Sequence, residues 1–398
     1  MSQFHDVPLA PADPILGLTE QFNADANPKK TNLGVGVYLD ETGKLPLLDC
    51  VREAEARLAS DPKAHGYLAI DGVAAYDAAV KALVFGADSE AVTAGRVVTV
   101  QTLGGTGALK VGADLLQSLT PDAAVLISNP SWEHHRALFT KAGFEVGQYR
   151  YYDASLGGID IEGLLEDLRA AVSGTIVVLH ACCHNPTGYD LTLDQWRRVV
   201  DVVAERGLVP FLDMAYQGFN AGLEQDGRAI GLFVEAGLNP LVSTSFSKSF
   251  GLYGERVGAL SLVCDDADEA KRVLSQVKIM IRTNYSSPPG HGATVVATVL
   301  GTPELRAGWE AELAGMRDRI KEMRRALVAG LAAAGVERDM SYITDQIGMF
   351  SYSGLTKEQM VRLRNDFGVY GTDTGRMCVA ALNPGNIEHV CASIARVL

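Results

Sequence analysis

Lys248 lies in the part of this chain whose residue types are best suited to chemistry. An apolar, strand-like run at residues 241–242 leads into hydroxyl residues, and Ser245 and Ser247 come just before the lysine, with Arg256 shortly after it. A lysine amine can condense with an aldehyde, and hydroxyl and guanidinium groups can hold a phosphate. This combination suits a cofactor that carries both groups. Taken alone, it also suits an ordinary solvated lysine in a loop, because most lysines are exposed.

A second candidate phosphate site occupies residues 103–110, where the sequence Leu-Gly-Gly-Thr-Gly-Ala-Leu-Lys follows a strand-like run and opens a helical pattern. Glycine lets the backbone approach an anion closely, and the free N–H groups and dipole of a helix N-terminus favour phosphate. Thr106 adds a hydroxyl donor. The glycine spacing matches neither a Walker A loop nor a dinucleotide-binding fingerprint. A plain turn is the alternative interpretation.

Asp213 ends the apolar run at residues 208–213 and is followed three residues later by the phenol of Tyr216. A carboxylate buried at the end of a strand needs a cationic or hydrogen-bonding partner. A protonated pyridine nitrogen can be that partner, and a ring kept protonated acts as an electron sink. We therefore expect Asp213 to face the nitrogen of a pyridine cofactor and Tyr216 to meet its ring hydroxyl. The alternative for Asp213 is a helix cap.

Side chains that suit such a ring also follow two further strand-like runs. Residues 185–188 read Asn-Pro-Thr-Gly, a turn sequence that carries the Asn185 amide. Trp132 offers a flat face for stacking on the ring, and His135 comes shortly after it. Individually, Trp132 also fits a core position and His135 a satisfied surface position. Together with the motifs above, however, they all fall at the carboxyl ends of predicted strands, where ligands gather in open α/β sheets.

The elements that must position these residues form a repeated pattern of buried strand and helix between residues 96 and 263. Helical patterns at residues 108–119 and 193–206 separate several of the strands. The strand-like runs are continuously apolar rather than alternating, which is typical of a mostly parallel sheet covered by helices on both faces. We expect an α/β fold with strands at residues 97–101, 124–128, 175–180, 208–213, 241–245 and 257–263.

A long helical pattern opens at Thr302 and runs to residue 334, which indicates a helix that links a large domain to a C-terminal α+β region. The N-terminal segment holds too little apolar material to fold alone, so we expect it to pack on that smaller region. We therefore predict a large domain at residues 41–310 and a small domain built from residues 1–40 and 311–398.

The composition is that of a globular protein with little affinity for polyanions. The 398 residues are 47% hydrophobic and 21% charged, with a formal net charge of −13. No block of Lys and Arg offsets this charge, which argues against nucleic acid and anionic membranes as partners. No apolar run is long enough to span a bilayer, and the first residues lack the pattern of a secretory signal. We expect a soluble, cytoplasmic protein.

The six cysteines lie mostly in apolar contexts and are interpreted as reduced thiols rather than a disulfide framework. Cys182, Cys183 and His184 invite a metal hypothesis. Adjacent cysteines on a strand point to opposite faces, however, and the spacing is not that of a zinc site. We therefore expect no metal.

Five motifs occur in the order Gly-Gly-Thr-Gly-Ala, His-Asn-Pro-Thr-Gly, Asp-x-Ala-Tyr-Gln-Gly-Phe, Ser-x-Ser-Lys-x-Phe-Gly-Leu-Tyr-x-Glu-Arg-Val-Gly and Asn-Tyr-Ser-Ser-Pro-Pro. With this set the chain resembles, over essentially its whole length, the fold-type I pyridoxal phosphate (PLP) aminotransferases. More narrowly, it resembles the bacterial aspartate and aromatic amino acid aminotransferases. The resemblance implies PLP as the cofactor, a mostly parallel central sheet covered by helices with a smaller α+β domain, and a homodimer with shared active sites.

The resemblance also implies a role for each residue around the cofactor. Lys248 would bind the cofactor aldehyde and shuttle the proton, while Asp213 would pair with the pyridine nitrogen, with His135 behind it. Tyr216 and Asn185 would hydrogen-bond the ring hydroxyl. The remaining implied contacts are the ring stacking of Trp132 and the phosphate contacts of Gly105, Thr106, Ser245, Ser247, Arg256 and the partner subunit's Tyr67.

For the substrate, the resemblance implies that Arg376 binds the α-carboxylate near the Gly36 backbone, and that the partner subunit's Arg282 reaches a distal carboxylate. The segments 284–289 and 348–352 are closer to the aromatic-type members, whereas Arg282 suits acidic substrates, so we expect both substrate classes. The other expected substrate contacts are Trp132, Asn185 and an apolar wall of Phe350, Ile15, Leu16 and Val35. For this wall, ordinary core packing is the alternative.

The expected reaction is a ping-pong transamination of aromatic or acidic L-amino acids with 2-oxoglutarate or oxaloacetate, with Lys248, Asp213 and Tyr216 as the catalytic residues. A strict aspartate aminotransferase is one alternative. Another is a different PLP reaction on the same fold, such as decarboxylation or β-elimination. A third is a non-catalytic binding protein that keeps the fold, and the complete set of Lys, Asp, Tyr and Arg argues against it.

Overall fold

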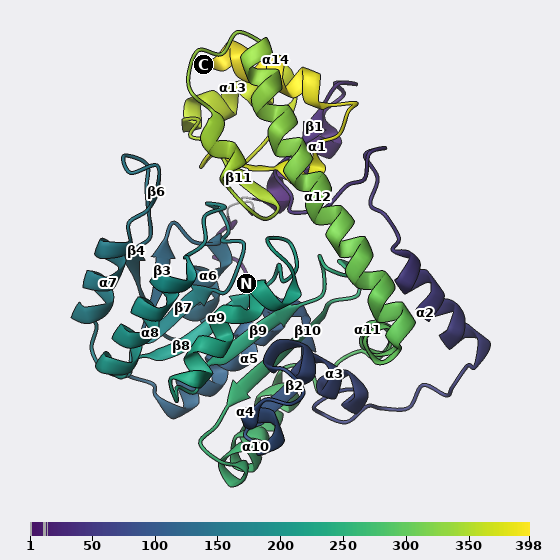
Figure 1. Cartoon of the computed structure of the whole chain (residues 1–398), viewed down its shortest axis with the longest axis vertical. Coiled ribbons are helices and arrows are strands. Elements are labelled where there is room, and N and C mark those ends of the chain that lie inside the picture. Colours follow the sequence, from purple (N-terminus) through teal and green to yellow (C-terminus); the bar gives the residue numbers. More distant parts are fainter. Residues whose placement is uncertain (1, 11–12, 14) are drawn as a thin grey trace. The chain divides into compact units, whose positions relative to one another are not determined.

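The structure is a computed structural model that describes residues 2–10, 13 and 15–398, with the side chain of Leu16 outside the description. The chain divides into two compact units. The large unit comprises residues 45–321 and 345–348, and the small unit comprises residues 1–44, 322–344 and 349–398. Each unit contains both strands and helices (Figure 1).

A seven-stranded sheet forms the centre of the large unit, in the order β2-β10-β9-β8-β7-β3-β4 (Figure 1). Neighbouring strands are parallel except at β10, which runs antiparallel to both β2 and β9. The predicted mostly parallel sheet is therefore confirmed, with one reversed strand. The strands are β2 (Val97–Leu103), β3 (Ala124–Asn129), β4 (Glu145–Arg150), β7 (Ile176–His180), β8 (Val209–Met214), β9 (Leu241–Ser245) and β10 (Val257–Val263).

Six of these strands match the expected apolar runs, whereas β4 was not predicted. Within β4 only Tyr149 is fully buried, and the exposed residues include Glu145 and Arg150. β4 pairs with β3 alone, so it lies at the edge of the sheet. An edge strand is covered less completely than a central one and commonly carries charged residues. The rule of continuous apolar runs therefore does not detect it.

Helices cover both faces of this sheet, as the continuous apolar strands require. One layer comprises α5 (Gly104–Leu119), α6 (Glu133–Ala142) and α10 (Ala267–Asn284), and the other comprises α3 (Ala74–Phe85), α7 (Ile161–Ala170), α8 (Leu193–Arg206) and α9 (Leu223–Glu235). The approach of α5 to the sheet depends on Gly112, where a Cβ would lie 2.6 Å from the Phe211 ring of β8. This close packing fixes β8, the strand that carries Asp213.

Two of the predicted helices can be compared with the structure at their ends. The helix expected at residues 193–206 has those bounds because Thr192 and Gln195 form a capping box and Gly207, with φ of 63°, ends it. The helix expected from residue 108 begins earlier, at Gly104. Its first residues are glycines and a threonine, so the apolar periodicity that marks a helix becomes visible only later.

The long helix expected after Thr302 is confirmed as α12 (Pro303–Ala333), and the boundary between the two units falls within it. Among the described residues, no helix combines the length and the apolar character that crossing a bilayer requires. The other elements of the large unit are α2 (Asp49–Ser60), α4 (Glu90–Thr93), α11 (His291–Gly301), and the strands β5 (Tyr152–Asp153) and β6 (Gly158–Ile159).

The small unit is built from both ends of the chain. β1 (Thr31–Asn32) pairs in parallel with β12 (Val369–Tyr370), and β11 (Phe350–Tyr352) pairs antiparallel with β13 (Arg376–Cys378). Leu33 continues this pairing, because its N–H donates to Tyr370 O and its carbonyl accepts from Cys378 N–H, both at 2.7 Å. The other elements are α1 (Leu16–Ala24), α13 (Lys357–Phe367), α14 (Ile387–Val397), and the 3-10 turns η1 (Ser341–Thr344) and η2 (Val379–Ala381).

Candidate active site

The carboxyl ends of β7, β8 and β9 lie side by side at one edge of the large sheet. His180 is in register with Asp213, and Asp213 is in register with Ser243. β10 runs in the opposite direction and therefore begins at this same edge, where Val257 lies opposite Leu103. The residue before β10, Arg256, is thereby brought to the N-terminus of α5. The reversed strand explains how an arginine that precedes a strand joins residues that follow strands.

Backbone and side-chain donors converge on the N-terminus of α5. Arg256 Nη1 donates to Ser247 Oγ at 3.2 Å, and a Cβ at Gly104, whose φ is +68°, would lie 2.6 Å from Arg256 Nη2. A Cβ at Gly105 would lie 3.1 Å from the Cβ of Ser245. These approaches favour glycine, which also leaves the first N–H groups of the helix uncovered. A cation, hydroxyls and a helix N-terminus together are the chemistry of a phosphate site.

The first turn of α5 is anchored to the sheet. Ser243 Oγ in β9 donates to the carbonyl of Gly105 at 3.1 Å. Thr106 is solvent-exposed in the same turn, which places its hydroxyl at the same end of the helix. The predicted phosphate residues Gly105, Thr106, Ser245, Ser247 and Arg256 are therefore brought together in the structure.

Asp213 is buried at the end of β8, where its Oδ2 lies 3.0 Å from His135 Nε2. His135 Nδ1 in turn lies 2.9 Å from Ser131 Oγ. Burial raises the pKa of Asp213, but the hydrogen bond and charge of His135, with the charges of His180 and Lys248, outweigh burial and lower that pKa below its ordinary value. The carboxylate is therefore ionised at neutral pH. Such a group suits a cationic partner such as a protonated ring nitrogen.

His180 belongs to this cluster, although the sequence predicts it only as the last residue of a strand. Its ring packs against His135 at 4.9 Å and against His184 at 4.2 Å between centroids. Burial, and then the charges of these two histidines, lower the pKa of His180 far below its ordinary value. Both ring nitrogens are buried without a hydrogen-bond partner among the described residues. Buried polar atoms are rarely left unsatisfied, so this imidazole indicates a site that a bound group completes.

The predicted amine and phenol also come together. Lys248 is half-buried in the turn between β9 and β10. Its Nζ lies 4.8 Å from the centroid of the Tyr216 ring, which is buried two residues beyond β8. Lys248 is also close enough to Asp213 for its charge to help lower the pKa of that carboxyl. The lysine, the phenol and the carboxylate thus share one side of the sheet edge.

Two further predicted ring contacts lie at neighbouring strand ends. Asn185 is buried five residues beyond the end of β7. Trp132 is half-buried immediately before α6, where its ring stacks on His134 at 4.8 Å and 17°. It also meets His135 edge-on at 5.4 Å and 84°. Trp132 therefore lies beside the Asp213–His135 pair, and its stacking on a cofactor ring stays a prediction.

In the small unit, the predicted substrate residues form a compact group. Arg376 is buried, its Nη2 donates to Gly34 O at 2.7 Å, and its guanidinium lies 4.4 Å from the centroid of the Phe350 ring. A Cβ at Gly36 would lie 2.7 Å from Phe350 Cζ. The ring of Phe350 is thus in contact with both the arginine and the Gly36 backbone. Of the remaining wall residues, Ile15 and Val35 are half-buried, and the side chain of Leu16 lies outside the described residues.

Tyr67 and Arg282 are exposed in the single chain. Tyr67 is fully exposed, at 102% of its reference area, within an exposed stretch at residues 61–67. Arg282 is exposed near the C-terminal end of α10, where it donates to Ser286 Oγ. The structure of one chain therefore does not bring either residue to the cluster around Lys248. Their predicted roles require a second subunit.

The prediction that Cys182 and Cys183 point to opposite faces of a strand is wrong. Cys182 and Cys183 lie beyond the end of β7, and the φ of +52° at Cys183 turns the chain. Their sulfur atoms therefore lie within 4.8 Å of each other and of an Asp226 carboxylate oxygen rather than on opposite faces. Asp226, however, already accepts three backbone N–H groups, at 2.8–3.0 Å. These bonds make it a structural acceptor within the loop.

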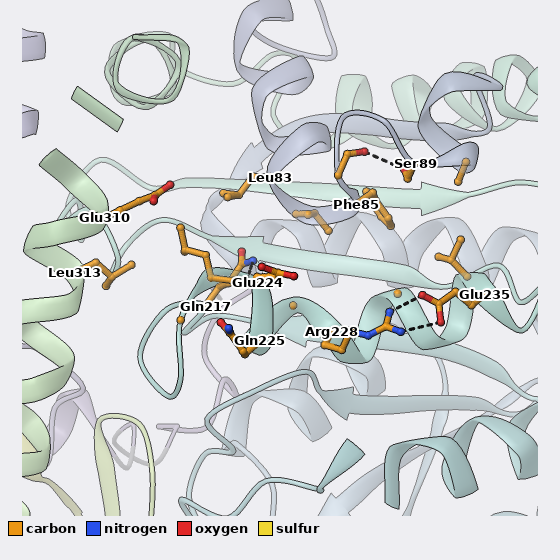
Figure 2. Close-up of a pocket in the computed structure, with 18 of the residues that line it drawn as sticks. Leu83, Phe85, Ser89, Gln217, Glu224, Gln225, Arg228, Glu235, Glu310 and Leu313 are labelled. Carbon is orange, nitrogen blue, oxygen red and sulfur yellow. Dashed lines mark hydrogen bonds and ion pairs between the residues drawn. The ribbon is translucent and has the colours of Figure 1, made fainter. Parts of the chain in front are cut away.

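A cavity of about 1020 Å³ in the large unit lies away from this chemistry (Figure 2). It is bordered by residues of α3, α9 and the first part of α12, and by Gln217. Neither Lys248 nor Asp213 lines it.

Phosphate, ring nitrogen and aldehyde are the three features of PLP that a protein must recognise. The helix N-terminus with Arg256 fits the first, the ionised Asp213 fits the second, and Lys248 fits the third. On a mostly parallel α/β sheet, this arrangement defines a PLP-dependent enzyme of fold type I. The chain belongs to the aminotransferase class I and II family, whose sequence profile matches residues 28–394.

Individual relatives agree with this family over the whole chain. The aspartate aminotransferase of Pseudomonas aeruginosa is 60% identical over 398 residues, covering 100% of both chains. The aromatic-amino-acid aminotransferase of Escherichia coli is 50% identical, covering 99% of this chain and 100% of its own. The crystal structure of an aromatic-amino-acid aminotransferase from Burkholderia pseudomallei, covalently bound to PLP, superposes with a TM-score of 0.97 at 61% identity and covers 100% of both chains. The predicted fold class, enzyme class and cofactor are confirmed: this is a PLP-dependent aminotransferase.

Proposed function

We propose that the enzyme transfers amino groups from both aromatic and acidic L-amino acids to 2-oxoglutarate or oxaloacetate in a ping-pong reaction. The observation that carries the reaction class is the cluster of Lys248, Tyr216 and the ionised Asp213 at the sheet edge. The dual range is supported by two relatives of nearly equal identity, 60% and 61%, which carry the names of the aspartate and the aromatic enzyme. The chain also carries Arg282, which suits an acidic side chain, and the apolar Phe350.

PLP, when bound, supplies an aldehyde that condenses with amines and a ring that withdraws electrons from the substrate carbon. The chain would hold it at four places: the ring nitrogen, the ring hydroxyl, a ring face and the phosphate. Asp213, supported by His135, would keep a positive charge on the ring nitrogen, and Tyr216 and Asn185 would orient the ring through its hydroxyl. Trp132 covers a ring face. The phosphate contacts are Gly105, Thr106, Ser245, Ser247, Arg256 and the partner subunit's Tyr67.

The proton transfer belongs to Lys248. Its Nζ would accept the proton from the α-carbon of the amino acid and deliver it to the cofactor carbon that carried the aldehyde, which is the work of a general base and then a general acid. Arg376 binds the α-carboxylate, because a buried guanidinium offers paired donors that match a carboxylate. Gly36 and Phe350 pack beside that arginine and limit the direction from which the substrate enters.

We further propose a cytoplasmic homodimer in which each site uses residues of both subunits. The exposure of Tyr67 and Arg282 supports this, because residues with these roles need a partner surface to complete the site. The six cysteines are all buried as free thiols, which fits a reducing compartment. Within each subunit, residues 41–310 would form the PLP-binding domain, and residues 1–40 and 311–398 the small domain.

A half-reaction screen tests the proposed substrate range. The PLP-loaded enzyme is mixed with one amino acid at a time, and the loss of the visible band of the bound cofactor is followed. We expect aspartate, glutamate, phenylalanine and tyrosine to bleach the band and an oxo acid to restore it. Bleaching by acidic amino acids alone would indicate a strict aspartate aminotransferase. Release of carbon dioxide or ammonia without restoration by an oxo acid would indicate decarboxylation or elimination instead.

Arg282→Leu is expected to separate the two substrate classes. Truncating one partner of a buried, hydrogen-bonded charge pair costs about 2–5 kcal/mol, so kcat/KM for aspartate should fall by about 10²–10³-fold. Phenylalanine and tyrosine offer no distal charge, so their kcat/KM should fall much less. Arg272→Leu, an exposed arginine on the same helix, serves as the control and should leave both classes unchanged. Equal losses for both classes would show that Arg282 supports the site as a whole.

Mixing two inactive variants tests the shared active site. Lys248→Ala and Arg282→Leu homodimers should each be nearly inactive toward aspartate. After they are refolded together, about half of the dimers should be mixed, each with one site that carries neither lesion. Roughly a quarter of wild-type activity should then return, because one site in two works in about half of the dimers. If mixed dimers form and no activity returns, Arg282 acts within its own chain.

A further inference from the structure

The loop that follows Tyr216 has a backbone that few side chains would tolerate. Gly218 has φ of +94°, and a Cβ there would lie 2.3 Å from Leu313 Cδ2. Gly222, at the end of the loop, has φ of +138°. These are conformations that essentially only glycine adopts at low cost. Loop 216–222 is therefore held in one specific path between β8 and α9.

Asp226 accepts hydrogen bonds from several backbone N–H groups of this loop. It lies in the first turn of α9 and is only 3% exposed. One carboxylate oxygen accepts from the N–H groups of Gly218 at 2.8 Å and Asn220 at 3.0 Å, and the other accepts from Ala221 N–H at 2.9 Å. Buried backbone N–H groups must be paired, and bonds to an ionised acceptor are the stronger kind. One side chain thus satisfies three donors of a single loop.

Two further hydrogen bonds hold the loop from other sides. Arg317 Nη1 donates to Gly218 O at 2.9 Å, and Gln217 Nε2 donates to Leu223 O at 2.9 Å. The outer side of the loop faces the cavity of about 1020 Å³, where Figure 2 shows Gln217, Gln225 and Leu313 along its border. Gln217 and Phe219 are buried, and Gly218 packs against Leu313, so side-chain packing also holds the loop. Packing cannot satisfy backbone N–H groups, however, and Asp226 is the side chain that accepts three of them.

We propose that Asp226 is a positioning residue for the aminotransferase reaction, acting through Tyr216. The loop that Asp226 fixes begins at Tyr216, and Phe219 N–H donates back to Tyr216 O at 3.1 Å. Fixing the loop fixes the phenol, whose ring lies 4.8 Å from Lys248 Nζ. This inference rests on the proposed role of Tyr216 as the partner of the cofactor's ring hydroxyl. Under this proposal Asp226 contacts neither the cofactor nor the substrate.

The charge of Asp226 is needed because both of its oxygens are in use. In Asp226→Asn, one oxygen becomes an NH₂ group, which is a donor and faces at least one backbone N–H. At least one of the three bonds is then lost without a change in side-chain volume. Losing a hydrogen bond to a charged group is expected to lower kcat/KM by about tenfold when the phenol moves with the loop.

The test compares Asp226→Asn, Tyr216→Phe and the double variant in PLP-loaded enzyme. The pH titration of the visible band of the bound cofactor is measured beside kcat/KM, because a purely structural role would not move that titration. We expect Asp226→Asn to shift the titration in the same direction as Tyr216→Phe. In the Tyr216→Phe background, Asp226→Asn should add less than about a twofold change, since residues that act through each other are non-additive. Asp266→Asn is the control: this exposed cap of α10 accepts two backbone N–H groups, and its loss should leave the titration unchanged.

Three results would overturn the proposal in distinguishable ways. Equal fold-losses from Asp226→Asn in both backgrounds would show that it does not act through Tyr216. An unshifted titration in Asp226→Asn beside a shifted one in Tyr216→Phe would lead to the same conclusion. An unshifted titration in Tyr216→Phe would instead reject the role of Tyr216. If Asp226→Asn does not fold, Arg317→Met removes the bond to Gly218 O from the other side, and the same loss of additivity is then required of it.

Discussion

Lys248→Ala is expected to abolish transamination while leaving the fold and the affinity for phosphate intact. A general acid or base contributes about 10²–10⁴-fold to a rate, and the role proposed for Lys248 also includes binding the cofactor aldehyde. Turnover should therefore fall by about 10³-fold or more. The phosphate contacts at α5, Ser247 and Arg256 are untouched by the substitution. PLP should thus still bind, without the visible band that depends on the lysine.

Lys271→Ala provides the matched control. Lys271 is exposed and makes a surface ion pair with Asp268, and solvent screening leaves such a pair with little effect on stability. Its removal should change neither turnover nor the cofactor spectrum. Wild-type turnover in purified Lys248→Ala would contradict the assignment of the reactive amine. Complete loss of PLP binding would show instead that the phosphate cradle alone is too weak to retain the cofactor.

Asp213→Asn should have the second-largest effect. The substitution keeps the size of the side chain and removes the charge that would hold a proton on the ring nitrogen. Losing one preorganised electrostatic partner typically costs about 10²–10³-fold in rate. The loss should appear in the half-reaction with a single amino acid, measured in a stopped-flow instrument. A loss below about tenfold would mean that Asp213 only supports the strand end.

The pH dependence of this residue follows from the direction of its pKa shift. The pKa of Asp213 is lowered because His135, His180 and Lys248 outweigh the effect of burial. The ionised carboxylate therefore stabilises the folded state at any pH above the ordinary pKa of an aspartate. This stabilisation is lost only as the pH falls through the lower pKa that Asp213 has in the folded state. Across the neutral range the wild-type carboxylate stays charged. Asp201→Asn, on the exposed side of α8, is the control and should leave the rate of the half-reaction unchanged.

The sequence predicts the fold well wherever burial on both faces imposes a simple pattern. The continuous apolar runs identify β7, β8 and β9, whose residues are buried on both sides of the sheet except at Val209. The edge strand β4 carries mostly polar residues and leaves no such signal. The reversed direction of β10 is also invisible in its composition, because a buried strand is equally apolar in either direction.

The candidate site was predictable to the extent that its residues sit in short motifs. Lys248 and Asp213 follow apolar runs, so strand ends could be inferred before any strand was paired. His180 became recognisable only through its register with Asp213 and its unsatisfied nitrogens. Asp226 looks like any acidic residue in the first turn of a helix until the loop folds back onto it. The register of His180 with Asp213 joins distant parts of the chain, and the bonds to Asp226 depend on the path of its loop, so neither is encoded in a short sequence pattern.

The reversed strand β10 also determines the separation between Lys248 and Arg256. Because β10 returns antiparallel to β9, one loop at residues 246–256 carries both the reactive amine and the arginine at the phosphate cradle. Phe246 N–H donates to Val257 O at 3.0 Å, which closes the two ends of that loop onto each other. The spacing between Lys248 and Arg256 is thus set by a short covalent tether rather than by the packing of separate elements. With the roles proposed for these two residues, the loop sets the distance between the group that binds the aldehyde and the group that binds the phosphate. Inserting or deleting a single residue in the loop is therefore expected to weaken cofactor binding.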